Sequence, residues 1–132
     1  MLQALPIFSA EQIKLIDTYT IQSEPIASID LMEGAASKCS QWIMKHYDVE
    51  TVFKVCCGLG NNGGDGLAIA RQLLQHGYKV EVFIINYSDK CSEDFLINKK
   101  RLEDLFSRFL MEVNDVKHLP HFQKSDVIID AL

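Results

Sequence analysis

The chain lacks the features that define several large classes of protein. Its net charge is −5, so it has no excess of lysine and arginine of the kind on which nucleic-acid binding depends. It contains no apolar run long enough to cross a membrane, and its N-terminus lacks the charged and apolar regions of a signal peptide. Its four cysteines have no metal-ligand spacing. These absences predict a cytoplasmic protein with reduced thiols that binds neither nucleic acid nor membranes.

The apolar residues that are present are enough for one domain with a single core. Hydrophobic residues make up 48% of the 132 positions, and short apolar runs alternate with stretches of helical periodicity. This alternation is typical of a parallel sheet with helical crossovers, so the predicted fold is an α/β, Rossmann-like, three-layer α/β/α sandwich. The predicted helices span about 9–21, 28–46, 66–76 and 92–106, and the predicted strands span 51–57, 79–85, 109–113 and 126–130.

Local signals indicate where several helices begin and end. Ser9 and Gln12 form a capping box at the first helix, Pro25 interrupts the helical pattern, and Gly77 ends the third helix in a left-handed conformation. The second helix carries an apolar stripe at three- and four-residue spacing, which predicts one buried face. The stripe consists of Leu31, Met32, Ala35, Cys39, Trp42 and Ile43.

The most informative segment is the loop at residues 58–66, Gly-Leu-Gly-Asn-Asn-Gly-Gly-Asp-Gly. It follows the predicted strand 51–57 and leads into a predicted helix, the position at which α/β proteins bind phosphate groups on exposed helix N–H groups. Glycine has no Cβ, so this loop can bring its backbone close to a ligand. The segment therefore predicts a binding loop of the nucleotide type.

The polar residues of the loop leave two interpretations open. The spacing G-x-G-x-x-G matches the dinucleotide-binding fingerprint, but no acidic residue ends strand 79–85 to hold a ribose, and no Lys-Ser/Thr follows the glycines as in a P-loop. Asn61 and Asn62 can serve only to shape the turn, and Asp65 only to cap the next helix. Alternatively, their side-chain oxygens face a polar ligand or a hard cation beside the phosphate-binding N–H groups.

Four other polar residues are weaker candidates for a site. Asp130 lies at the carboxyl end of strand 126–130, where parallel sheets bind ligands, so it is the best of them. Asp126, at the opposite end of the same strand, is expected to face solvent. His118 and His121 have no carboxylate or cysteine partner nearby in sequence, and they are interpreted as part of a solvated loop.

Three segments together resemble the YjeF N-terminal domain family, the NAD(P)HX epimerases. Residues 29–36, Ile-Asp-Leu-Met-Glu-Gly-Ala-Ala, are similar to the family's Leu-Met-Glu-Arg-Ala-Gly signature. The loop at 58–66 is similar to its Gly-x-Gly-Asn-Asn-Gly-Gly-Asp-Gly run, and residues 126–132 are similar to the start of its Asp-Ala-Leu-Phe-Gly-Thr-Gly run. The chain departs from the family at Gly34 and Ala36, where arginine and glycine are usual. The resemblance implies that residues 1–132 form the front portion of a longer epimerase domain.

The resemblance also implies an activity and a set of site residues. The family converts (R)-NADHX or (R)-NADPHX to the (S) form, and an ADP- or ATP-dependent dehydratase, fused or separate, then restores the cofactor. The implied substrate-binding residues are Asn61, Asn62, Gly63, Gly64 and Asp65, and the implied ligands of a potassium ion are Asn62 and Asp130. A homodimer is expected.

The chemistry that the resemblance implies suits a carboxylate. Inversion at C6 of the hydrated ring needs proton transfer at the oxygen that leaves and the oxygen that enters, together with stabilisation of positive charge. Asp65 is the hypothetical catalytic residue. The alternatives are a non-catalytic scaffold module of the same fold, which would predict a degraded Asn-Asn-Gly-Gly-Asp run, and a conventional NAD(P)-binding dehydrogenase domain.

Overall fold

A computed structural model describes residues 7–23 and 27–132. Within these residues, four α-helices, two short 3-10 helices and four strands follow one another along the chain. Their bounds are α1 Ala10–Ser23, α2 Ser28–His46, β1 Val52–Cys57, α3 Asn61–Gln75, β2 Lys79–Ile85, α4 Glu93–Phe106, η1 Ser107–Phe109, β3 Leu110–Val113, η2 Val116–His118 and β4 Val127–Ala131. None of the described helices is long and apolar enough to cross a membrane.

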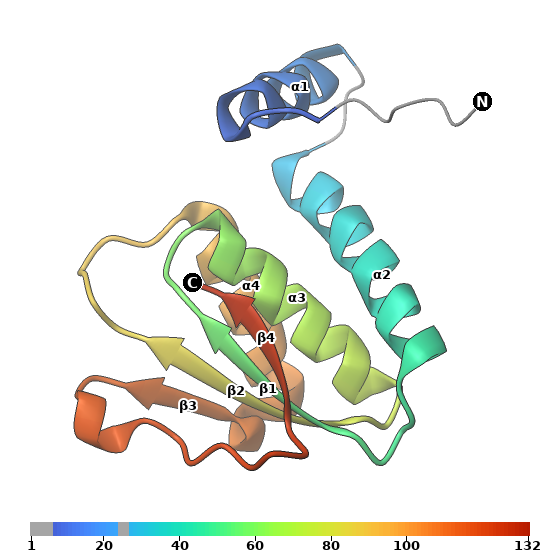
Figure 1. Cartoon of the computed structure of the whole chain (residues 1–132). Coiled ribbons are helices and arrows are strands. Elements are labelled where there is room, and N and C mark those ends of the chain that lie inside the picture. The colour runs from blue at the N-terminus through green and yellow to red at the C-terminus, as the bar shows by residue number, and fades with distance from the viewer. Residues whose placement is uncertain (1–6, 24–26) are drawn as a thin grey trace.

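The four strands form one parallel sheet in the order β3-β2-β1-β4 (Figure 1). Strand β1 lies in the middle, with Val55 opposite Val82 of β2 and Ile129 of β4. The parallel sheet and the α/β class are therefore confirmed. Because all four strands run in one direction, their carboxyl ends meet at one edge of the sheet, where the loop after β1 and the end of β4 lie side by side.

Helices α2, α3 and α4 pack on the same face of the sheet. The alternate residues Phe53, Val55 and Cys57 of β1 point to this face and are fully buried. A Cβ on Gly66 of α3 would contact Val55 and Cys57, and Tyr47, at the end of α2, packs edge-on against Phe53. The core thus lies between one layer of helices and the sheet, and α3 crosses its centre (Figure 1). Within residues 7–23 and 27–132 no α-helix packs on the other face, so the second helical layer of the predicted three-layer sandwich is not observed.

The helix ends follow the local sequence signals in most places. The backbone N–H of Ser9 donates to Gln12 at 2.8 Å and that of Gln12 donates to Ser9 at 3.2 Å, which confirms the capping box. Gly77 has φ +82°, the left-handed conformation predicted after α3. The side chain of Ser92 caps α4 by accepting from the N–H of Phe95. The predicted break at Pro25 lies outside the described residues.

The buried face of α2 differs from the predicted stripe. Met32, Ala36 and Ser40 are the buried residues of this helix, whereas Trp42 is 56% exposed and stacks on His46. The prediction that Trp42 lies in the core is wrong. Helix α2 packs mainly on α3, so its buried residues lie on the side that faces that helix.

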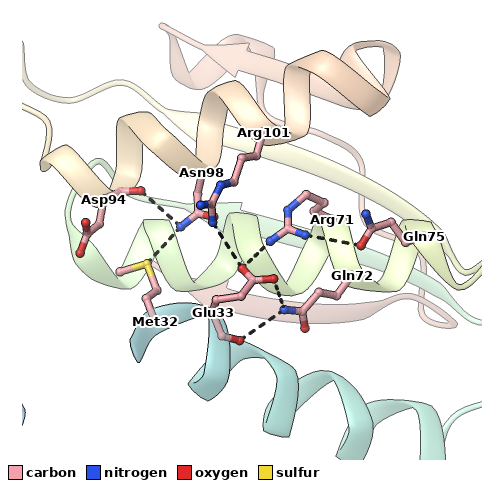
Figure 2. A network of polar contacts seen from close by, with 8 residues as sticks. All are labelled: Met32, Glu33, Arg71, Gln72, Gln75, Asp94, Asn98 and Arg101. Carbon is pink, nitrogen blue, oxygen red and sulfur yellow. Dashed lines mark hydrogen bonds and ion pairs between the residues drawn. The ribbon is translucent and has the colours of Figure 1, made fainter. Parts of the chain in front are cut away.

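A polar network joins α2 to α3 and α4 (Figure 2). The carboxylate of Glu33 accepts hydrogen bonds from Arg71 at 2.5 Å and Gln72 at 3.0 Å, and Arg101 lies 3.8 Å away. Burial alone would raise the pKa of Glu33, but the hydrogen bonds from Arg71 and Gln72 and the two arginine charges lower it overall. Glu33 therefore stabilises the fold as a carboxylate, and this contribution is lost as the pH falls through its lowered pKa.

Replacing Glu33 should test how much this network stabilises the helical layer. Glu33→Ala is expected to lower the free energy of unfolding at pH 7 by about 2 kcal/mol, because it leaves Arg71, whose side chain is 10% exposed, without its carboxylate. This loss is smaller than the loss expected on breaking a fully buried ion pair, because the side chain of Glu33 is 35% exposed. Urea unfolding followed by circular dichroism measures it. Glu33→Gln, which keeps an acceptor oxygen, should lose less; equal stability of all three proteins would contradict the prediction.

Candidate functional site

The loop between β1 and α3 packs tightly against the carboxyl end of β4. The N–H of Gly58 donates to the carbonyl oxygen of Ala131 at 2.9 Å, which continues the parallel ladder one residue beyond the end of β1. A Cβ on Gly63 would lie 2.0 Å from the carbonyl oxygen of Gly58, and a Cβ on Gly66 would lie 2.5 Å from Cβ of Ala131. The glycines at these two positions therefore allow α3 to begin directly against the sheet.

Helix α3 begins earlier than predicted. It starts at Asn61 with Gly60 as its N-cap, so the expectation of a helix from Gly66 with Asp65 as N-cap is wrong. The close approach of Gly63 to Gly58 lets the glycine-rich segment form the first turn of the helix. The N–H of Gly64 already donates to Gly60 at 3.0 Å, which places Asp65 beyond the N–H groups that have no partner within the helix.

Asp65 lies in a cavity of about 480 Å³ between the middle of α1 and the N-terminal parts of α2, α3 and α4. Its lining residues are Lys14, Asp17, Thr18, Ser28, Leu31, Met32, Ala35, Asn61, Asp65 and Asp94. Burial raises the pKa of Asp65 to about 6, and the negative charges of Asp17 and Asp94 add to this rise. An aspartic acid with a pKa near neutrality can both donate and accept a proton at physiological pH.

The five residues predicted to bind substrate divide into two kinds. Asn61 and Asp65 line the cavity and can touch a ligand there. Gly63 and Gly64 are buried and determine how closely the helix approaches its neighbours. Asn62 points elsewhere: its side chain donates to the carbonyl oxygen of Leu132 at 3.0 Å.

Asn62 and Asp130, the two predicted ligands of a cation, meet at the same chain segment. Asp130 accepts from the N–H of Leu132 at 3.1 Å, and Leu132 is also the acceptor for Asn62. These bonds use the amide nitrogen of Asn62 and one carboxylate oxygen of Asp130. The remaining amide and carboxylate oxygens are hard donors of the type that binds a potassium ion, so the residues present fit such an ion.

Asp126 does not face solvent as predicted. Its side chain is 5% exposed and lies 3.1 Å from the ammonium group of Lys54, which also donates to the backbone oxygen of His121. The hydrogen bond from the N–H of Gln123 and the charge of Lys54 lower the pKa of Asp126. This pair fastens the β3–β4 connection to the sheet, away from the cavity. His118 and His121 are exposed, as expected for a solvated loop.

The sequence analysis missed the residues that α1, α2 and α4 bring to the cavity. Asp94 is 66 positions from Ser28, yet its carboxylate accepts a hydrogen bond from the Ser28 hydroxyl at 2.5 Å. Asp17 reaches the cavity from α1. The only local signal for any of them is Ser92, a predictable cap that places Asp94 in the first turn of α4. Contact between helices so far apart in sequence cannot be predicted from spacing.

Comparison with known proteins shows to which family the chain is related. The sequence profile of the family described as YjeF-related protein N-terminus matches residues 28–132. The chain belongs to this family. The match includes the binding loop, the three helices that pack on the sheet and all four strands. The resemblance seen in the sequence is therefore confirmed.

Individual relatives carry names that specify a reaction. A protein named NAD(P)H-hydrate epimerase from Lentilactobacillus buchneri is 37% identical over 100% of this chain and 58% of its own length. One of the same name from Anaerococcus prevotii is 34% identical over 96% of this chain and 58% of its own. The "Bifunctional NAD(P)H-hydrate repair enzyme Nnr" of Salinibacter ruber is 36% identical over 76% of this chain and 19% of its own length. The chain thus spans about three-fifths of the two epimerases.

A solved structure agrees with the fold. The crystal structure of yeast ynu0 superposes with a TM-score of 0.60 and 28% sequence identity. The superposition covers 82% of this chain and 47% of the yeast chain. The arrangement of helices and strands described above is therefore that of a known protein fold.

Proposed function

We propose that the protein is an NAD(P)HX epimerase that converts (R)-NADHX or (R)-NADPHX to the (S) form. The observation that carries this proposal is Asp65, a carboxyl group with a pKa raised to about 6, in a cavity beside the N-terminus of α3. The names of the relatives support the substrate class. The N–H groups in the first turn of α3 offer a site for the substrate's diphosphate, and Asn61 adds an amide to the cavity.

The proposed reaction uses one proton and returns it. Protonated Asp65 donates a proton to the C6 hydroxyl as the C–O bond breaks, so that water leaves and the ring nitrogen and C6 form an iminium cation. The resulting carboxylate stabilises this cation. Water then adds to the opposite face of C6 and releases a proton to solvent, and Asp65 regains a proton from solvent. No atom or electron is gained or lost overall, as an epimerisation requires.

A potassium ion held by Asn62 and Asp130 is part of the proposal. The ion would supply a positive charge close to the substrate's phosphates and fix the loop against the end of β4. Its support is the pair of oxygen donors that meet at Leu132. We also propose that the protein is cytoplasmic and forms a homodimer. The exposed edge strands of the sheet favour such association. We propose further that an ADP- or ATP-dependent dehydratase consumes its product.

The proposed function can be tested by following the two epimers of NADPHX by chromatography. The chain should speed the loss of the (R) epimer at least tenfold over the uncatalysed rate, and replacing potassium by tetramethylammonium should reduce this acceleration. An NAD(P)-binding dehydrogenase would instead bind NADPH tightly without potassium. A rate equal to the blank with potassium present would overturn the proposed function and favour a scaffold module.

A further inference from the structure

Asp94 brings a second carboxylate to the cavity that holds Asp65. It is the second residue of α4, and its carboxylate accepts the hydroxyl hydrogen of Ser28, the first residue of α2, at 2.5 Å. Both residues line the cavity. The hydrogen bond therefore joins the first turns of α2 and α4. It holds the negative charge of Asp94 in a fixed position within the proposed active site.

The backbone around Asp94 is held from three sides. The N–H of Ser92 donates to the carbonyl oxygen of Leu59 in the binding loop at 3.0 Å. Asn98, which is 1% exposed, donates to the carbonyl oxygen of Asp94 at 3.3 Å and contacts the sulfur of Met32 at 3.2 Å (Figure 2). Gly64, next to Asp65, lets α3 approach α2 and α4 closely, because a Cβ at this position would contact Met32 of α2 and the backbone of α4.

The other charged groups that face the cavity come from α1. Lys14 and Asp17 line it from that helix, and the residues of α2 that line it, Ser28 among them, are uncharged. Asp65 thus lies among two further carboxylates and one ammonium group. Of the two carboxylates, Asp94 is the one whose position a hydrogen bond to another element fixes. Its charge therefore acts on Asp65 from a fixed position, whereas no hydrogen bond within the described part of the chain anchors the carboxylate of Asp17.

We propose that Asp94, held by Ser28, is a positioning residue of the epimerase site whose negative charge increases the fraction of Asp65 that is protonated near neutral pH. Its role rests on the proposed function, because a protonated Asp65 is needed only if a hydroxyl group must leave. A carboxylate within the same cavity disfavours a second negative charge, and the hydrogen bond from Ser28 keeps this carboxylate from turning away.

The test is the titration of Asp65 in Asp94→Asn, followed by carbon NMR of the side-chain carboxyl groups. The midpoint of Asp65 should fall, and kcat/KM for (R)-NADPHX at pH 7 should fall about threefold as the protonated fraction decreases. The descending limb of the pH profile should move to lower pH by the same amount as the NMR midpoint. A purely structural role would lower the rate without moving either.

Matched variants keep the outcome interpretable. Asp104→Asn, on an exposed part of the same helix, should leave both readouts unchanged, and Asp94→Glu should restore them because it keeps the charge. Ser28→Ala removes the hydrogen bond and should move the midpoint in the same direction by less. An unchanged midpoint in a folded Asp94→Asn overturns this role. NMR measures the titration midpoint of Asp65 without any turnover of substrate. Failure of the epimerase assay alone would therefore count against the proposed function and not against the role of Asp94.

Discussion

Gly63→Ala is expected to lower the free energy of unfolding by about 3 kcal/mol and to abolish substrate binding. The added methyl group would lie 2.0 Å from the carbonyl oxygen of Gly58 and 2.7 Å from its carbonyl carbon. Both are backbone atoms, so no side-chain rotation can relieve the overlap. The first turn of α3 would have to move away from β1, which displaces the N–H groups proposed to bind the diphosphate. Urea unfolding and calorimetric titration with NADPHX measure the two effects.

Two other glycines provide matched controls for this substitution. A Cβ on Gly60, three residues earlier in the same loop, or on Gly34 in α2 would have no neighbour within 4 Å. Gly60→Ala should therefore cost less than about 1 kcal/mol, the difference expected at an N-cap. Gly34→Ala should raise stability by up to about 1 kcal/mol, because alanine favours the helix interior. A Gly63→Ala protein as stable as Gly60→Ala would contradict the close approach of loop and helix.

The elements with strong periodicity could be predicted well from the sequence, and the one with unusual residues could not. Strand β2 has the predicted bounds, because its apolar run is flanked by clear turn residues. The predicted start of helix α3 is five residues too late, because four glycines and two asparagines near its start have low helix propensity. Packing overrides that propensity: Gly63 and Gly66 are needed so that the helix can touch β1 and β4.

Only the part of the candidate site that is formed by residues adjacent in sequence could be predicted. The loop residues are contiguous, so their spacing alone indicated a binding site. The pairing of Asn62 with Asp130 as ligands came only from the resemblance, since no local signal joins residues so far apart in the sequence. Asp94, Ser28 and Asp17 could not be found, because their meeting depends on how three helices pack. The raised pKa of Asp65 depends on burial within that packing, which no sequence pattern reports.

Burial of Asp65 has opposite consequences for stability and for the proposed chemistry. In the unfolded chain its pKa is about 3.8, and in the folded protein it is about 6. The folded state therefore holds the proton more tightly, and stability falls as the pH rises from about 4 to 6. Above pH 6 the protein carries the full cost of a half-buried carboxylate. That cost is of the order of 1 kcal/mol once solvent screening of the partly exposed group is allowed for.

Asp65→Asn should consequently make the protein more stable and less active at once. At pH 7 we expect a gain of about 1 kcal/mol in the free energy of unfolding, which disappears below pH 4, where the wild-type residue is protonated. We expect at least a 100-fold loss of kcat/KM, since an amide cannot exchange a proton with the ring hydroxyl. Thermal unfolding at several pH values and the epimer assay measure the two quantities. Asp104→Asn, which removes an exposed carboxylate, should change neither.

The two readouts of Asp65→Asn separate a catalytic role from a structural one. A folded variant that keeps the full rate would remove Asp65 from proton transfer. A variant that loses both rate and stability at pH 7 would show that the carboxylate stabilises the loop. A loss of rate together with a gain of stability is the result expected for a carboxyl group whose ionisation the fold disfavours. The same effect increases the fraction of Asp65 that holds a proton near neutral pH.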